Sequence, residues 1–448
     1  MDQGDARWHC GAASGQLMID VSRKTALFFD ASAGYTHIAE AVVPEFARVL
    51  YFNNWETAFP QARDITPGIG LEGVERVSDF FDALEDADVA IFTDVGNGGL
   101  QEFLRARGMP VFGSGRSEAL ERDRWFLKQT ARESGIDYSD GFLIHGIENL
   151  RKLLQRQNDL YVKISYLRGD MESFHHENYL SSKPWIDQLS LNLGPYGAVA
   201  DFIVEPPIES DLCVEVGADP AWCCDGKFPS EILWGYEEKD RAYAGTIHAL
   251  PAKLQSVLDK LSPVLAKDGY RGPLSTETRE CEDASYLIDL TCRFPEPPSS
   301  VHSLLARNWG EMMYGAATGQ PVEPDYLAHY AVQFVLRSPF GAEHPLAVKI
   351  GMPERVTIHG HAIIENQDYA VSPAEIEEFG AGCGFSDSLS DAAEEALEAA
   401  KSVEGYQVSF DEAALEKLME TIQNGRKLDL QWGQINGENH GEESRTAS

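Results

Sequence analysis

Short apolar runs alternate with amphipathic stretches along the first quarter of the chain. The runs at 25–32 and 87–94 are long enough for buried strands, and the second is followed by a glycine-rich turn and an amphipathic segment that ends at Arg107. Strands that alternate with helices at this spacing predict an open parallel sheet. We expect its strands at 25–32, 47–52, 87–94 and 109–115.

The pattern changes after residue 116. Residues 117–135 form one amphipathic stretch, for which Ser117 is the expected N-cap and Gly135 the expected stop. The rest of the chain mixes strands and helices without an internal repeat. We expect strands at 142–146, 160–166, 200–208, 211–219, 272–281 and 285–294, short strands within 330–370, and helices at 251–266, near 300–316, at 388–401 and at 411–424.

These patterns predict an α/β (α+β multidomain) protein. A chain of 448 residues is too long for one ordinary core, so about two to four packed units are expected. The polar end of the chain is predicted to be disordered. We expect an N-terminal extension (1–24), a first α/β domain (25–116), a central region (117–325), a mixed C-terminal domain (326–430) and a tail (431–448).

Composition excludes several classes of protein. Apolar residues make up 43% of the chain, and no apolar run reaches the roughly 18 residues of a spanning helix, so no membrane segment is expected. The first 20 residues carry acids and a tryptophan where a signal peptide has a basic start and an apolar block. We therefore expect a cytoplasmic location. A net charge of −35 makes a broad nucleic-acid or anionic-membrane surface unlikely.

Cysteine usage points to no metal or redox site. The seven cysteines form no CxxC pair and no Cys/His spacing of the zinc type. Cys223 and Cys224 are adjacent, which disfavours a bond between them. We expect reduced cysteines that serve as small apolar residues.

Two neighbouring strands near the end of the central region carry the strongest chemical pattern. Alternation along 286–294 puts Asp289, Thr291 and Arg293 on one face, and Glu277 comes from the adjacent strand. Two carboxylates on neighbouring strands suit a magnesium ion bound together with phosphate oxygens. An ordinary surface ion pair between Asp289 and Arg293 is an equally good interpretation of these two strands alone.

Two weaker patterns lie upstream. Lys163 is flanked by Val162 and Ile164 in an apolar strand, so it requires an anion such as a nucleotide phosphate, unless the strand is an edge and the lysine faces water. The strand at 200–208 ends in a double proline after Glu205, where pairing must stop and free backbone groups can read an adenine edge. Asp211 follows this segment closely and could accept hydrogen bonds from ribose hydroxyls. The alternative interpretation is that the segment is an ordinary loop after a strand.

Taken together in order and spacing, these pieces resemble the ATP-grasp superfamily, and within it phosphoribosylamine–glycine ligase and the biotin-carboxylase group. The resemblance spans residues 25 to about 425 and is specific only in short blocks. It implies an N-terminal Rossmann-like pre-grasp domain (25–116), an ATP-grasp nucleotide-binding region (117–325), a small mixed C-terminal domain, and the cofactors ATP and Mg²⁺, with Mn²⁺ as a substitute.

The resemblance also implies a role for each matching residue. Arg124 and Lys163 would contact phosphates, Glu205 the adenine neighbourhood and Asp211 the ribose, whereas Glu277, Asp289 and Thr291 would hold the metal. Arg293 would steady the transferring phosphate. Arg124 stands where the family usually has lysine and Thr291 where it has asparagine. The loop 167–174 has one glycine where relatives have several, so Arg168 is expected to cover the phosphates in place of a glycine-rich lid.

The expected activity is an ADP-forming ligation of a small acid to an amine through an acyl phosphate, in a protein that could be a homodimer. The loop 31–37 lacks the glycine-rich pattern that phosphoribosylamine binding would require, which argues against a purine-pathway enzyme. Trp234, Tyr236, Glu237 and Arg241 are candidate substrate contacts, with a plain solvated loop as the alternative. Two rival functions are a phosphotransferase that stops at a phosphorylated product and a nucleotide-binding scaffold without catalysis.

Overall fold

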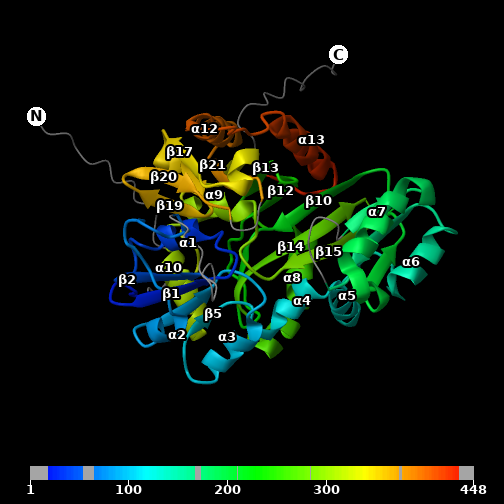
Figure 1. The fold of residues 1–448 in the computed structure, drawn as a ribbon, viewed down its shortest axis with the longest axis horizontal. Helices are drawn as coiled ribbons and strands as arrows, with labels where there is room; N and C mark the ends of the chain where they lie inside the picture. The colour runs from blue at the N-terminus through cyan, green and yellow to red at the C-terminus, as the bar shows by residue number, and fades with distance from the viewer. Residues whose placement is uncertain are drawn as a thin grey trace, which may run out of the picture.

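The computed structural model describes residues 19–53, 65–166, 173–208, 210–282, 284–372 and 376–432. The predicted lid residue Arg168, Cys10 and the predicted disordered tail beyond residue 432 lie outside these ranges. Four sheets organise the described chain. Figure 1 shows the N-terminal sheet at one end of the molecule and the small domain with α6 and α7 at the other.

The N-terminal sheet is parallel, with strand order β3-β2-β1-β4-β5, and it confirms the predicted open sheet. Because both faces of this sheet are buried, its strands have apolar residues on both sides and appear in the sequence as continuous apolar segments. Asp30 closes β1 and is buried, where the Tyr51 hydroxyl donates to it at 2.6 Å. The elements are β1 Thr25–Asp30, α1 Thr36–Ala41, β2 Arg48–Asn53, β3 Val74–Arg76, α2 Phe80–Ala83, β4 Val89–Phe92, α3 Gly98–Arg105 and β5 Val111–Phe112.

The helix predicted at 117–135 is broken. A 3-10 turn (Gly115–Glu118) and α4 (Ala119–Arg122) precede α5 (Arg124–Glu133), and the N-cap of the long helix is Asp123, not Ser117. The Asp123 carboxylate accepts from the backbone of Trp125 and Phe126, which satisfies two free N–H groups of the first turn. Gly135 ends the helix with a positive φ, as expected.

A small domain follows, built on the antiparallel sheet β6-β9-β7-β8. Its two helices were not predicted, because their sequences lie in a stretch that reads as strand-rich. They pack on each other and enclose a separate apolar core. The elements are β6 Phe142–His145, α6 Ile147–Leu154, β7 Leu160–Ile164, β8 Ser173–His176, α7 Tyr179–Leu193 and β9 Asp201–Glu205.

The large sheet runs in the order β11-β14-β10-β12-β13-β16-β21-β18, with β15 paired to β14. It continues past residue 325 because β13 pairs with β16, so the central and C-terminal regions share one sheet. Its elements are β10 Cys213–Ala218, β11 Ala221–Cys224, β12 Trp234–Glu238, β13 Ala242–Thr246, α8 Ala252–Asp268, β14 Arg271–Cys281, β15 Ser285–Thr291, α9 Pro298–Leu305, α10 Trp309–Thr318, β16 Tyr330–Arg337, β18 Val356–Ile358 and β21 Glu378–Ser386.

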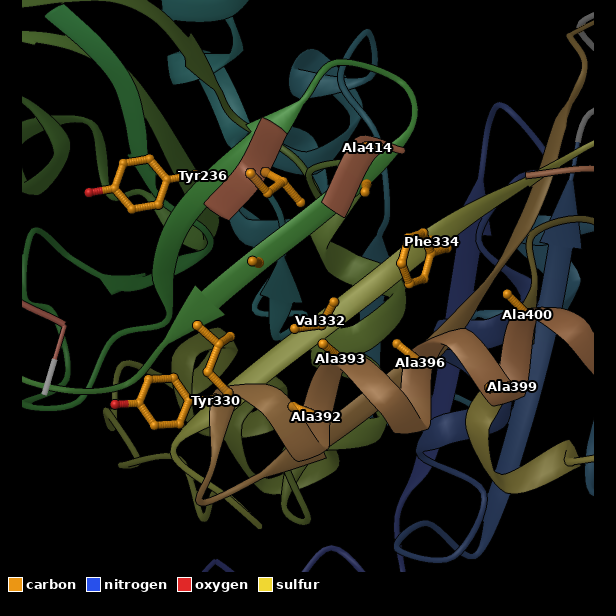
Figure 2. Close-up of a cluster of buried hydrophobic side chains, with 14 of the residues drawn as sticks. Tyr236, Tyr330, Val332, Phe334, Ala392, Ala393, Ala396, Ala399, Ala400 and Ala414 are labelled. Carbon is orange, nitrogen blue, oxygen red and sulfur yellow. The ribbon is translucent and has the colours of Figure 1, made fainter. Parts of the chain in front are cut away.

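Two C-terminal helices cover one face of this sheet. Alanines of α12 (Leu389–Lys401) lie against Val332 and Phe334 of β16, and their small side chains let the helix approach the strands closely (Figure 2). Helix α13 (Ala414–Lys427) packs on β10, β12 and β13. The remaining sheet, β19-β20-β17-β22, consists of β17 Leu346–Ile350, β19 His361–Ile364, β20 Gln367–Ala370 and β22 Val403–Gly405, and α11 is Pro339–Glu343.

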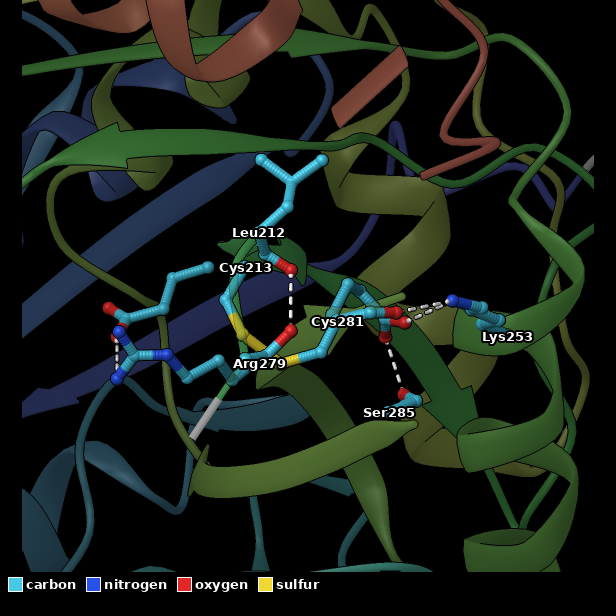
Figure 3. Close-up of a disulfide and its surroundings, with 9 residues drawn as sticks. Leu212, Cys213, Lys253, Arg279, Cys281 and Ser285 are labelled. Carbon is cyan, nitrogen blue, oxygen red and sulfur yellow. Dashed lines mark hydrogen bonds and ion pairs between the residues drawn. A yellow bond between two sulfur atoms is a disulfide. The ribbon is translucent and has the colours of Figure 1, made fainter. Parts of the chain in front are cut away.

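The expectation that all cysteines are reduced is wrong for one pair. Cys213 and Cys281 face each other in the β10–β14 ladder and form a disulfide (Figure 3). A separation of 68 residues hides this proximity in the sequence. Cys223, Cys224, Cys292 and Cys383 form no disulfide and are buried, as expected of small apolar residues.

Loss of this disulfide should destabilise the large sheet. The bond closes a loop of 68 residues, so the double variant Cys213→Ser/Cys281→Ser is expected to lose about 2–4 kcal/mol in free energy of unfolding, because its unfolded chain is less restricted. Urea unfolding with and without reductant measures this. The double variant should not respond to reductant; equal midpoints for the oxidised and reduced wild type would contradict the prediction.

Within the described residues, no helix combines the length and the apolarity that crossing a bilayer requires.

Candidate active site

Two neighbouring cavities lie on the face of the large sheet opposite α13. The larger one, about 410 Å³, lies between this sheet and the small domain. The smaller one, about 180 Å³, lies beside it over β10, β12 and β14, and we call it the acidic cavity. Glu215, Lys239 and Glu277 border both. The charged residues of the larger cavity are Arg124, Lys163, Lys239, Arg279, Glu205, Glu215, Glu277 and Asp289.

The predicted carboxylate pair borders the larger cavity. Glu277 of β14 and Asp289 of β15 are directly opposite in the antiparallel register, so their side chains share one face. Although Glu277 is open to the cavity, desolvation and the nearby Asp289 carboxylate raise the pKa of Glu277 to about 7. Asp289 accepts from Arg124 Nε at 3.3 Å. Two carboxylates that repel each other favour a cation between them.

This donor set fits magnesium bound with a nucleotide. Among the described residues no group of three or more His, Cys, Asp or Glu side chains is arranged to hold a metal. A protein-only cage is therefore absent from that part of the chain, whereas magnesium in nucleotide sites needs only one or two carboxylates and takes its other ligands from phosphates and water. Thr291 borders the acidic cavity, while Asp289 borders the larger one.

Arg124 lies at the start of α5, next to the end of β7 in the small domain. It is the first residue of α5 and is buried, and its guanidinium donates to the Ile164 carbonyl at 3.2 Å. The N-cap Asp123 also accepts from Ser165 Oγ at 2.8 Å. These contacts fix the start of α5 against the end of β7, so the Arg124 guanidinium reaches both the cavity and Asp289.

Glu205 holds two lysines. Its buried carboxylate lies 3.3 Å from Lys163 Nζ and also forms an ion pair with Lys128, which donates to the Ser139 carbonyl at 2.9 Å. Burial lowers the pKa of Lys128, and the Glu205 carboxylate opposes that shift. Sequence reasoning missed Lys128, although it lies four residues after Arg124 and hence on the same helix face.

Some of the other residues predicted to bind the nucleotide border a cavity, and others do not. Pro206 and Ile208 of the double-proline segment border the larger cavity together with Glu205. Asp211 is exposed and does not border either cavity. Arg293 borders neither cavity. Its Nε lies 3.0 Å from Glu121 of α4 and 3.4 Å from Asp94, which belongs to the N-terminal domain.

The candidate substrate contacts need correction. Trp234 and Tyr236 are fully buried against α13 and the C-terminal core, so the interpretation of this segment as a substrate-contacting loop is wrong for them. Residues 234–238 form a strand, and alternation sends the even positions into the core and Gly235 and Glu237 to the acidic cavity. Arg241 forms an ion pair with Asp411 at the surface.

Three acids of the acidic cavity, Glu215, Asp219 and Glu296, were not predicted from the sequence. Burial raises the pKa of Asp219 to about 7, although the Ser275 hydroxyl donates to its carboxylate. Burial also raises the pKa of Glu296 to about 8; this residue lies 3.5 Å from both His37 and His359. Asp219 and Glu296 follow strand ends in sequence, and alternation along β10 could have indicated Asp219.

These pKa shifts predict two opposing effects of pH on stability. The folded-state pKa values of about 7 for Asp219 and about 8 for Glu296 lie above those of free carboxyls, which are near 4, so between about pH 4 and pH 8 the folded protein binds more protons than the unfolded chain and these two groups lower the free energy of unfolding as the pH rises. Burial lowers the pKa of His302 to about 3 and that of His359 to about 4, so these two residues lower stability as the pH falls below about 6.5, which is the acid limb. Above about pH 6.5 the carboxyl effect of these groups is unopposed and gives the alkaline limb.

Urea unfolding across pH 4–10 measures both limbs of this profile. Asp219→Asn should flatten the alkaline limb and make the acid limb steeper, since the removed carboxyl opposes the histidines between about pH 4 and pH 6.5. An alkaline limb as steep in the variant as in the wild type would contradict the role given to Asp219.

Comparison with known proteins supports the fold. The sequence matches no protein-family model and no curated protein. Its structure is similar to phosphoribosylamine–glycine ligase from Thermotoga maritima (TM-score 0.65, 17% identity, 86% of this chain and 98% of that one). It is also similar to a biotin carboxylase from Campylobacter jejuni in a β,γ-ATP complex (0.62, 12%, 88% and 98%). A third similar structure is the biotin carboxylase domain dimer of Hydrogenobacter thermophilus 2-oxoglutarate carboxylase, with MgADP and bicarbonate (0.63, 11%, 89% and 98%).

These likenesses show the predicted fold. The chain has an ATP-grasp fold with an N-terminal Rossmann-like domain and a mixed C-terminal region, and the similarity covers most of its length.

Proposed function

We propose that this protein is an ATP-dependent, magnesium-requiring ligase that joins a small carboxylic acid to an amine and releases ADP and phosphate. The observation that carries the proposal is the shared border of the two cavities. Glu277 lines both, so a nucleotide in the larger cavity would present its terminal phosphate beside a second substrate site. The similar structures support the reaction class, since they include ATP-grasp ligases.

ATP is expected to occupy the larger cavity. Its adenine would lie by Pro206 and Ile208, where β9 has ended and backbone groups are free to pair. Asp211 lies three residues after Ile208 outside the cavity lining, and its contact with the ribose is proposed from its place in the sequence alone. Lys163 and Arg124 would offset phosphate charge. Because Glu205 binds Lys128 as well as Lys163, one carboxylate keeps both ammonium groups fixed near the phosphates.

The reaction follows from this placement. A carboxylate oxygen of the acid attacks the γ-phosphorus and ADP leaves, which produces an acyl phosphate; the amine nitrogen then attacks the acyl carbon, loses a proton, and phosphate leaves. Magnesium held by Glu277 and Asp289, with Thr291 proposed as a further ligand, would neutralise phosphate charge. Most of the rate gain in such reactions comes from positioning and electrostatics.

Arg293 is proposed to steady the transferring phosphoryl group. It lies two residues after Thr291, and its guanidinium is already held by Asp94 of the N-terminal domain and Glu121 of α4. Phosphate contact would require Glu121 and Asp94 to share it with the substrate. Arg293→Lys keeps the charge but not the planar fork, and should therefore lower turnover more than nucleotide affinity.

The test is ADP release with a panel of acids and amines, with hydroxylamine as a trap. A ligase forms a hydroxamate from the acid when the amine is absent and an amide when it is present. A stable phosphorylated product that hydroxylamine does not intercept would identify a phosphotransferase. Nucleotide binding without ADP formation under any pairing would overturn the ligase proposal.

A further inference from the structure

Helix α7 of the small domain has apolar side chains on both of its faces. Its inner face packs into the core of the domain through Ile186 and Leu189. Leu180 and Leu191 lie on the outer face, where they are 84% and 75% exposed. A helix that is apolar all round is normally buried all round. The outer face of α7 is therefore suited to contact with another molecule.

The exposed apolar side chains gather in this part of the fold. Among the described residues, five of the thirteen large apolar side chains that are exposed lie within 180–199. Figure 1 shows α7 at the end of the molecule away from the N-terminal sheet, where a second molecule can approach it. An exposed apolar patch on a soluble protein marks a contact site. We call these five residues the α7 patch: Leu180, Trp185, Leu191, Tyr196 and Val199.

Helix geometry aligns the two leucines, and the segment that follows them is uncharged. Leu191 comes about three turns after Leu180, so both side chains are on one side of the helix, about 16 Å apart along its axis. Residues 188–200 contain no acidic or basic residue. The charges of the helix, Lys183 and Asp187, pair with each other, and Asp187 also pairs with Arg151 of α6 at 2.7 Å. Because these charges are satisfied within the domain, an occupant of the patch needs no charge of its own.

The distribution of charge along the chain selects the occupant that fits. The net charge is −35, yet residues 142–205, which make up the small domain, include eight acidic and six basic residues and so carry a net charge of −2. The other residues carry the remaining −33. Two copies of this chain therefore repel each other over most of their surfaces, and least where their small domains face each other. A nucleic acid or an anionic membrane would require basic side chains, which the patch lacks.

We propose that the α7 patch is the contact of a homodimer, in which the α7 helices of two copies pack antiparallel about a twofold axis. The same patch of both copies forms a twofold contact, so the patch must be complementary to itself. An uncharged apolar face meets this condition, because the contact brings no like charges together. The antiparallel arrangement places Leu180 of each copy opposite Leu191 of the other.

This contact leaves the larger cavity open. Alternation along β7 puts Val162 and Ile164 in the core beneath the helices. Tyr161 and Lys163, on the other face of the same strand, border the larger cavity. The α7 patch is therefore on the side of the small sheet away from the proposed nucleotide, and dimer formation does not depend on the ligase activity.

Sedimentation velocity of the full chain over about 1–100 µM measures this dimer, and we expect a reversible equilibrium between monomer and dimer. Leu191→Glu should raise the dissociation constant at least about tenfold, because each dimer would bury two unpaired carboxylates. The matched control is Phe81→Glu, which adds the same charge at a 62% exposed residue of α2 in the N-terminal domain. The control variant should keep the dissociation constant within about twofold of wild type.

A pair of complementary variants tests the antiparallel arrangement. Leu180→Lys, like Leu191→Glu, should weaken the dimer when it is studied alone. A mixture of the two variants should associate at least about tenfold more tightly than either one, because lysine then faces glutamate across the axis. Only folded chains can recover the dimer in this way, so the mixture separates a lost contact from a lost fold.

The response to salt is an independent measurement. A dimer joined by the α7 patch should tighten between about 0.05 and 0.5 M NaCl, because salt screens the repulsion between two chains of charge −35 and does not weaken apolar contact. A wild type that is monomeric at about 100 µM would overturn the inference. So would equal losses in Leu191→Glu and Phe81→Glu, a mixture that associates no more tightly than its components, or a dimer that weakens as salt is added.

Discussion

Asp289→Asn is expected to lower the rate of ADP formation by about 100-fold or more, the size seen when one preorganised charge at a reacting phosphate or oxyanion is removed. Asparagine keeps the size of the side chain and one acceptor oxygen but removes the negative charge that Glu277 and Asp289 together offer to magnesium. The variant should also need more magnesium for half-maximal rate. A coupled assay of ADP release over a magnesium series measures both effects.

The structure offers a matched control for this variant. Asp411 forms an ion pair with Arg241 at the surface, as Asp289 does with Arg124 beside the cavity. Asp411→Asn removes a charge and an arginine partner without touching either cavity, and should leave turnover within about twofold of wild type. Equal rates for the two variants would show that Glu277 and Asp289 do not hold the catalytic metal.

Glu205→Gln should destabilise the protein by about 3–5 kcal/mol, since breaking a buried ion pair on one side leaves uncompensated charge. Here one carboxylate serves both Lys128 and Lys163, and both lysines are largely enclosed. Glutamine has a similar shape but can neutralise neither ammonium group. The shift of the urea unfolding midpoint at constant slope measures the loss.

A double variant separates lost charge from lost packing. Lys128→Met combined with Glu205→Leu removes the most buried partner together with the carboxylate, and should recover part of the stability lost in Glu205→Gln. Lys163 would remain, with its side chain 15% exposed to the cavity. A cost below about 1 kcal/mol for Glu205→Gln would mean that these lysines are not held as buried ions.

Alternation and periodicity in the sequence determined much of the fold and part of the site. Four of the five strands of the N-terminal sheet and its parallel order follow from local spacing, whereas β3 was not predicted. The direction of Glu277 and Asp289 also follows from local spacing, because side-chain direction in a strand depends on position along it. The same rule could have separated Glu237 from Trp234 and Tyr236. The charged residues of the β12–β13 hairpin suggested a loop in the sequence. In the structure the hairpin is a pair of strands that packs against α13.

The tertiary structure alone decided which distant residues meet. Lys128, Lys163 and Glu205 come from a helix and two strands that are far apart in sequence, and Cys213 meets Cys281 only because β10 and β14 pair in one register. The acids of the acidic cavity likewise converge from separate elements. Local patterns carry no information about such meetings, because they depend on how strands are ordered in a sheet and how domains pack.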